Sequence, residues 1–179
     1  ALQYGALLVA LILFLFLWNA RTTAISLAAL PLSLAFTFLV MWVFGITINT
    51  MTLGGLAIAI GALVDDAIID VENAFQRLKE NAARPPDKQD ALWQVIFDSS
   101  MEVRRPIVIT TVAIVVIFVP LFFLAGIEGR LLRPLGFAYI VAIIASLLVA
   151  ITVTPVLCYY ILPGASTVQE AEDPWLIAW

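Results

Sequence analysis

Residues 54–73 read GGLAIAIGALVDDAIIDVEN and join an apolar stretch of membrane-spanning length to four acidic side chains. A transmembrane helix needs about 20 mostly apolar residues, which is the length of this stretch. The whole 179-residue chain has the same character, because 63% of its residues are hydrophobic and 12% are charged, whereas a water-soluble domain carries about 25% charged residues. Helices satisfy their own backbone hydrogen bonds in lipid, and no segment alternates like a barrel strand. The sequence therefore predicts an all-α, polytopic membrane helix bundle.

Five long apolar runs predict five transmembrane helices within residues 1–162. They cover about residues 1–18, 24–44, 50–73, 106–124 and 135–162. Residues 76–105 form a polar loop, and residues 163–179 form a short tail. Within the loop, Leu92, Val95, Ile96 and Ser99 recur at helical spacing. This spacing predicts a short helix from Asp87 to about Met101, which lies either in the membrane interface or against the bundle as a connector.

The nine Lys and Arg residues predict the orientation, because short loops rich in them stay on the cytoplasmic side. Seven of them fall on one side of the predicted bundle, and only Arg130 and Arg133 fall on the other. This asymmetry places the chain start and the turn at residues 45–49 outside, and the loop 76–105 and the tail in the cytoplasm. The apolar start has no basic segment before it and no initiating Met, so we expect a chain that begins within a longer protein and has no signal peptide here.

Histidine is absent from the sequence, and the single cysteine, Cys158, lies inside the fifth apolar run. This composition excludes a disulfide framework and a His or paired-Cys metal site within the chain. Cys158 is therefore interpreted as a small packing residue. We expect no cofactor, no bound metal ion and no nucleic-acid partner.

Two adjacent acids, Asp65 and Asp66, lie deep in the third apolar run. At 1.5 Å per residue they sit about 5 Å past the middle of the span, where an ionisable side chain costs several kcal/mol and is a functional candidate by default. Two neighbouring carboxylates in a low-dielectric site cannot easily both ionise, so at least one is expected to exchange protons. The pair is therefore predicted to be a proton relay.

Two more acids follow towards the predicted cytoplasmic end of the same helix. Glu72 shares a helical stripe with Asp65, and Asp70 shares the adjacent stripe with Asp66. Both approach the rim of the span, where acidic side chains can reach interfacial water, so we assign them lesser parts in the relay.

Small residues before the acids predict the close approach of another helix. They are Gly54, Gly55, Gly61 and Ala62. None of the five predicted spans contains Lys or Arg, so the partner of the acids is expected in sequence outside this chain.

Two interpretations from other classes compete with a relay. The acids could be static in a structural or assembly subunit without transport. If the reactivity of Asp65 and Asp66 towards a carboxyl reagent did not change with pH, that alternative would be favoured. An intramembrane aspartyl protease is disfavoured, because it needs its two carboxylates on different helices, whereas these are adjacent on one.

Two sets of motifs resemble the resistance-nodulation-division (RND) efflux pumps. Gly61-Ala-Leu-Val-Asp65, the following Asp66, and Val71-Glu72-Asn73 resemble the fourth transmembrane helix of that family. The segment from Val119 through Arg130 and onward to Cys158 resembles its fifth helix, outer loop and sixth helix. The resemblance covers about residues 1–162 and implies helices two to six of the N-terminal half.

The resemblance implies a secondary active transporter and not an enzyme, in the bacterial inner membrane as a multi-pass protein. It implies partners as well: the lipid bilayer, protons, and the first helix, porter region and C-terminal half of the same transporter. A homotrimer with a periplasmic adaptor and an outer-membrane channel is expected on the same ground.

The transported substrate depends on which branch of the family the chain resembles. The twin Asp65-Asp66 resembles the multidrug branch, which exports hydrophobic compounds. Asp65 with Glu72 seven residues on, together with Glu102-Val-Arg-Arg-Pro106, resembles the heavy-metal cation branch. We favour proton-driven export of heavy-metal cations, with the multidrug branch as the alternative.

Overall fold

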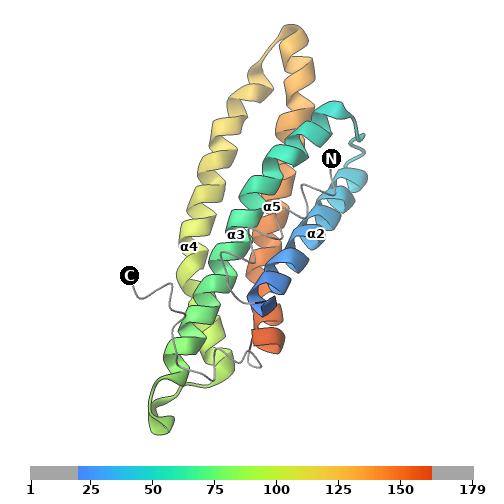
Figure 1. Ribbon diagram of the computed structural model, residues 1–179. Coiled ribbons are helices and arrows are strands. Elements are labelled where there is room, and N and C mark those ends of the chain that lie inside the picture. The colour runs from blue at the N-terminus through green and yellow to red at the C-terminus, as the bar shows by residue number, and fades with distance from the viewer. Residues whose placement is uncertain (1–19, 163–179) are drawn as a thin grey trace, which may run out of the picture.

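The computed structural model describes residues 20–162, which form four long helices and two short 3₁₀ turns (Figure 1). The helices are α2 (Ala20–Val43), α3 (Thr50–Ala82), α4 (Leu92–Phe118) and α5 (Gly126–Ile161), and the turns are η1 (Pro86–Lys88) and η2 (Val119–Phe123). No strand occurs within this range. Four helical segments here are long and apolar enough to cross a membrane, which confirms the all-helical membrane class. The first of the five predicted spans, residues 1–18, and the tail 163–179 lie outside the described residues.

A tight turn between α2 and α3 reverses the chain where the sequence predicts a turn. Gly45 adopts φ +67°, a left-handed conformation that costs glycine little. Asn49 then caps α3: its side-chain Oδ1 accepts hydrogen bonds from the backbone N–H groups of Met51 (2.9 Å) and Thr52 (3.0 Å). The Thr52 hydroxyl in turn accepts from the Asn49 N–H at 2.8 Å. This reciprocal capping box fixes where α3 begins.

The polar segment between α3 and α4 is shorter than predicted, because both helices extend into it. α3 continues to Ala82, beyond its predicted end at residue 73, and α4 already begins at Leu92. The predicted separate helix from Asp87 to Met101 is therefore wrong: Asp87 lies in η1, and residues 92–101 are the first turns of α4.

Packing explains why α4 runs without a break through Pro106. Val95 and Ile96 are buried in one cluster with Val71, Ala74 and Leu78 of α3. These contacts hold the first turns of α4 in the same helical register as the span that follows. A membrane-protein helix tolerates the missing proline N–H where neighbouring helices support it.

The fifth predicted span also begins earlier than expected. α5 starts at Gly126, nine residues before the predicted start at residue 135, and includes Pro134. Gly126 opens the helix with φ +76°, and the Arg133 guanidinium donates a hydrogen bond to the Leu124 carbonyl at 2.9 Å. This bond connects the first turns of α5 to the preceding segment. Because α5 begins at Gly126, most of the predicted outer loop is helical.

α3 runs between α2 and α4 and packs most extensively on α5 (Figure 1). Towards the start of α3, Leu56, Ala59 and Leu63 form a buried cluster with Ala138 and Ala142 of α5. The outer face of α4 is apolar and exposed at Ile109, Val112, Val116 and Ile117, as expected of a surface that meets lipid or another helix. Within residues 20–162, the fold thus buries one side of the acidic helix α3 and leaves its other side open.

Candidate functional site

The four acids of α3 lie in different environments. Asp65 is exposed, Asp66 and Glu72 are partly buried, and Asp70 is only 4% exposed. Asp66 and Asp70 are four residues apart, which puts them on the same side of the helix about 6 Å apart along its axis. The adjacent aspartates therefore do not share one environment: Asp66 continues a buried row towards Asp70, whereas Asp65 faces away from it.

The open face of α3 carries Asp65 together with small and apolar residues. Ile58 is 54% exposed, and a Cβ built on Gly61 meets no atom within 4 Å. Among the described residues, no helix covers this part of α3. Asp65 and Asp66 lie close enough for their charges to repel each other, so the open face and the buried row interact electrostatically.

At Gly55, the absence of a side chain brings the buried side of α3 into close contact with α5. A Cβ built on Gly55 would lie 2.3 Å from the Leu135 carbonyl oxygen and 3.3 Å from the Ala138 Cβ. Gly54 stands farther off, with Leu135 Cδ1 at 3.9 Å, and Ala62 is partly buried. Of the four small residues predicted for helix packing, Gly55 makes the tightest contact within the described chain, and Gly61 makes none.

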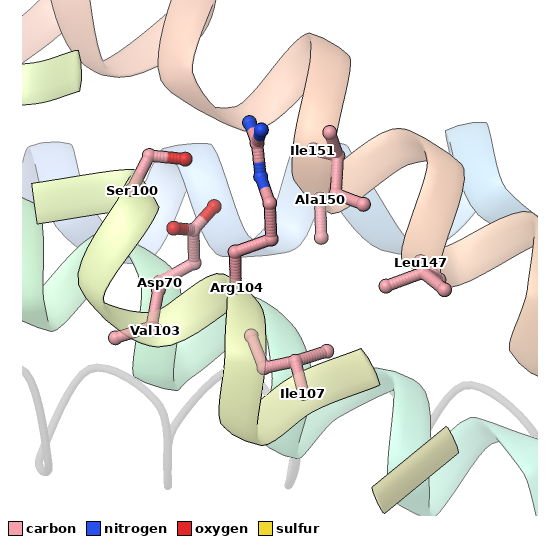
Figure 2. A pocket seen from close by; sticks show the side chains of 8 residues that line it. All are labelled: Asp70, Ser100, Val103, Arg104, Ile107, Leu147, Ala150 and Ile151. Carbon is pink, nitrogen blue, oxygen red and sulfur yellow. The ribbon is translucent and has the colours of Figure 1, made fainter. Parts of the chain in front are cut away.

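Asp70 faces α4, where the side chain of Arg104 lies beside it (Figure 2). The two line one small cavity with Ser100 of α4 and with Leu147, Ala150 and Ile151 of α5. Sequence reasoning placed Asp70 near the rim, within reach of water, but in the structure it is buried. The reason is the extra length of α3 and α4, whose packed ends cover it.

Arg104 is the residue of this site that the sequence analysis missed. It was assigned to a polar loop, and only the early start of α4 turns it towards Asp70. A signal was present, because Ser100, Arg104 and Ile107 recur at helical spacing on one face of the segment before and after Pro106.

A polar network joins the ends of α3 and α4 beyond Asp70. The Arg77 guanidinium binds both carboxylate oxygens of Glu102, from Nε at 3.0 Å and from a terminal nitrogen at 2.9 Å. Asn73 donates to the Ser99 carbonyl at 2.8 Å and to Glu102 at 3.3 Å. Such two-pronged arginine–carboxylate contacts are specific in geometry as well as strong.

Glu72 lies beside this network and belongs to a different set of contacts. Its Oε1 accepts a hydrogen bond from the Gln76 side chain at 3.2 Å. The Asp65 stripe therefore continues from the open face to a partly buried carboxylate near the polar end of α3.

No group of three His, Cys, Asp or Glu side chains that could hold a metal ion occurs in the part of the chain from 20 to 162. Cys158, 1% exposed, packs in the cluster with Ile25 and Val71. The cysteine is thus a core residue, as its position in an apolar run predicts.

Comparison with known proteins places these features in a family. The model of the AcrB/AcrD/AcrF family matches residues 1–179. The chain belongs to this family. The match confirms the resemblance to RND efflux transporters on which the predicted fold and function depend.

Individual relatives of this RND chain include proteins named for cation efflux and for multidrug resistance. The cation efflux system protein CusA of Escherichia coli (strain K12) is 42% identical over 171 residues, which cover 94% of this chain and 16% of CusA. The putative cation efflux system protein SilA of Salmonella typhimurium is 41% identical over 159 residues, 87% of this chain and 15% of SilA. The multidrug resistance protein MdtC of Escherichia coli O139:H28 is 38% identical over 163 residues, 91% of this chain and 15% of MdtC. The chain thus spans about a sixth of the length of the relatives it matches.

Proposed function

We propose that this RND chain is the proton-conducting part of an efflux pump that exports heavy-metal cations. The observation that carries the proposal is the row of acids on α3: Asp66 and Asp70 on the buried side, Asp65 on the open side, and Glu72 near the polar end. Acids inside a membrane-spanning helix are energetically costly, which makes them candidates for a function such as proton transfer.

In this mechanism Asp65 and Asp66 take up a proton and release it towards Asp70 and Glu72. Their mutual repulsion makes it unfavourable for both to be charged at once. Gain or loss of a proton therefore changes the charge on the open face of α3 as well as in its buried row. The change in charge would alter the electrostatic interaction with a helix that packs on this open face. A shift of that helix would then couple proton movement to export.

The partner on the open face is proposed to come from the remainder of the same transporter. Asp65, Gly61 and Ile58 present one acid among small and apolar side chains, a surface suited to a close helix carrying a basic or polar group. By family membership, we place the transporter in the bacterial inner membrane as a homotrimer that works with a periplasmic adaptor and an outer-membrane channel. The polar ends of α3 and α4 then face the cytoplasm.

Heavy-metal cations are the proposed substrate, because CusA and SilA carry cation efflux in their names and the pairing of Asp65 with Glu72 follows that branch. Export of hydrophobic compounds is the second candidate. It is favoured by the twin aspartates and by the 38% identity to MdtC. Cells that express the full-length transporter should resist added metal salts if the first assignment holds, and organic toxicants if the second holds.

Substitution of the two aspartates tests the relay. In the full-length transporter, Asp65→Asn and Asp66→Asn keep side-chain volume and remove the exchangeable proton, so each should abolish efflux driven by an imposed pH gradient. Asp98→Asn, an exposed acid on α4, is the matched control and should pump normally. Folding of each variant is checked by its amount in the membrane. Wild-type efflux by both Asn variants would favour the structural alternative.

A further inference from the structure

The cavity between α3, α4 and α5 has an unusual polar lining. Asp70 Oδ2 and Arg104 Nε are both buried without a hydrogen-bond partner, although the acid and the guanidinium lie near enough to interact electrostatically. A buried polar atom without a partner is energetically costly, and more so when it is charged. An arrangement that leaves both unpaired is therefore incomplete.

The size of the cavity limits what can complete it. It offers about 10 Å³ to a water-sized sphere, which is the minimum for a single water molecule. Figure 2 shows the Asp70 carboxylate beside the Arg104 side chain, with the Ser100 hydroxyl on the Asp70 side and Ala150 and Ile151 of α5 on the other side of Arg104. A cavity of this size excludes any organic ligand.

The chemistry of the lining decides between a water molecule and an ion. A carboxylate oxygen only accepts hydrogen bonds, and a guanidinium nitrogen only donates them. A cation at this point would be repelled by Arg104, and an anion by Asp70. A neutral molecule that donates on one side and accepts on the other satisfies both.

We propose that Asp70, Ser100 and Arg104 form a binding site for one internal water molecule that bridges the carboxylate and the guanidinium. The water donates to Asp70 Oδ2 and accepts from Arg104 Nε–H, and the Ser100 hydroxyl supplies a third partner. Buried waters typically make about three such bonds. If the proposed relay holds, this water extends the row from Asp66 and Asp70 by one hydrogen-bonded step towards α4.

A density map of the full-length protein at about 2 Å tests the site directly. The result expected is a water peak within hydrogen-bond distance of both Asp70 Oδ2 and Arg104 Nε. A cavity without density, or a direct contact between carboxylate and guanidinium, would overturn the proposal. This readout needs no transport, so it can fail while the relay stands, and the relay can fail while the water is present.

A thermal-stability cycle supplies a second, independent test. Ala150→Val puts methyl groups into the cavity and displaces a water, so it should lower the Tm of the full-length protein. The same change in an Asp70→Asn, Arg104→Met background should cost clearly less, because no charged pair then depends on a bridge. Ala150→Ser, which adds a hydroxyl instead, is the control and should be milder than Val. An equal loss of Tm for Ala150→Val in both backgrounds would mean that steric overlap, and not loss of a bridging water, causes the effect.

Discussion

Gly55→Ala is expected to loosen the contact between α3 and α5, and the structure gives the size of the effect. The new Cβ would lie 2.3 Å from the Leu135 carbonyl oxygen, 0.7 Å inside the 3.0 Å limit that Cβ contacts keep. Because the opposing atom belongs to the backbone, it cannot turn away as a side chain would, and the two helices must separate. Overpacking of this kind costs about 1–3 kcal/mol.

Gly54→Ala is the matched control on the same helix. A Cβ at Gly54 would lie 3.9 Å from Leu135 Cδ1, an ordinary van der Waals contact with the end of a flexible side chain. Both substitutions gain about 1 kcal/mol in helix propensity, so the difference between them isolates the close contact at Gly55. We expect Gly55→Ala to be less stable than Gly54→Ala by about 1–3 kcal/mol.

Reversible unfolding of the full-length protein in mixed detergent micelles measures this difference. The comparison is made between the two variants rather than with the wild type, so that the shared propensity gain cancels. Equal stabilities for the two variants would refute the close packing of α3 on α5 at Gly55.

Three further predictions concern the ends of the helices. Arg77→Ala removes the contacts with Glu80 and Glu102 and should destabilise the protein only slightly, since both pairs are exposed; a high-salt urea titration in which the loss persists undiminished would contradict this. Asn49→Ala removes the cap of α3 and should cost about 1 kcal/mol in thermal unfolding, whereas Asn49→Asp should cost little; equal losses for both would argue against the capping box. Cysteine placed at Glu128 should be labelled from outside intact cells and cysteine placed at Lys88 should not, and the opposite pattern would invert the proposed orientation.

The helical segments could be predicted from the sequence because each needs only a long apolar run. The ends next to the polar segment could not be predicted. Residues 74–82 and 92–101 are polar or mixed in character, and they become helical because the two segments, which are far apart in the sequence, pack on each other. Val95 and Ile96 are held against Ala74 and Leu78 in the structure, and neither partner alone predicts where a helix stops. The apolar run predicted that α3 begins near residue 50, whereas the cap formed by Asn49 and Thr52 was found only in the structure.

In the candidate site too, the features set by one helix could be predicted, and those set by packing between helices could not. The acids of α3 and their two stripes follow from helical geometry alone, so Asp65 and Asp66 were identified together. That Asp70 is buried and faces Arg104 depends on how α4 packs, which no local pattern in α3 contains. The same limit applies to the small residues: the sequence grouped them on one helix, and only the structure shows that Gly55 packs closely on α5 while Gly61 lies on the open face.

The central claim is that the aspartates of α3 couple proton movement to export, and proton flux in proteoliposomes measures this most directly. The full-length transporter is reconstituted with a pH-sensitive dye inside, and metal salt is added on the side from which export begins. We predict that metal transport by the wild type moves protons in the opposite direction, and that Asp66→Asn moves neither metal nor protons while Asp98→Asn moves both. Metal transport without proton movement in the wild type, or undiminished proton movement in Asp66→Asn, would contradict the account.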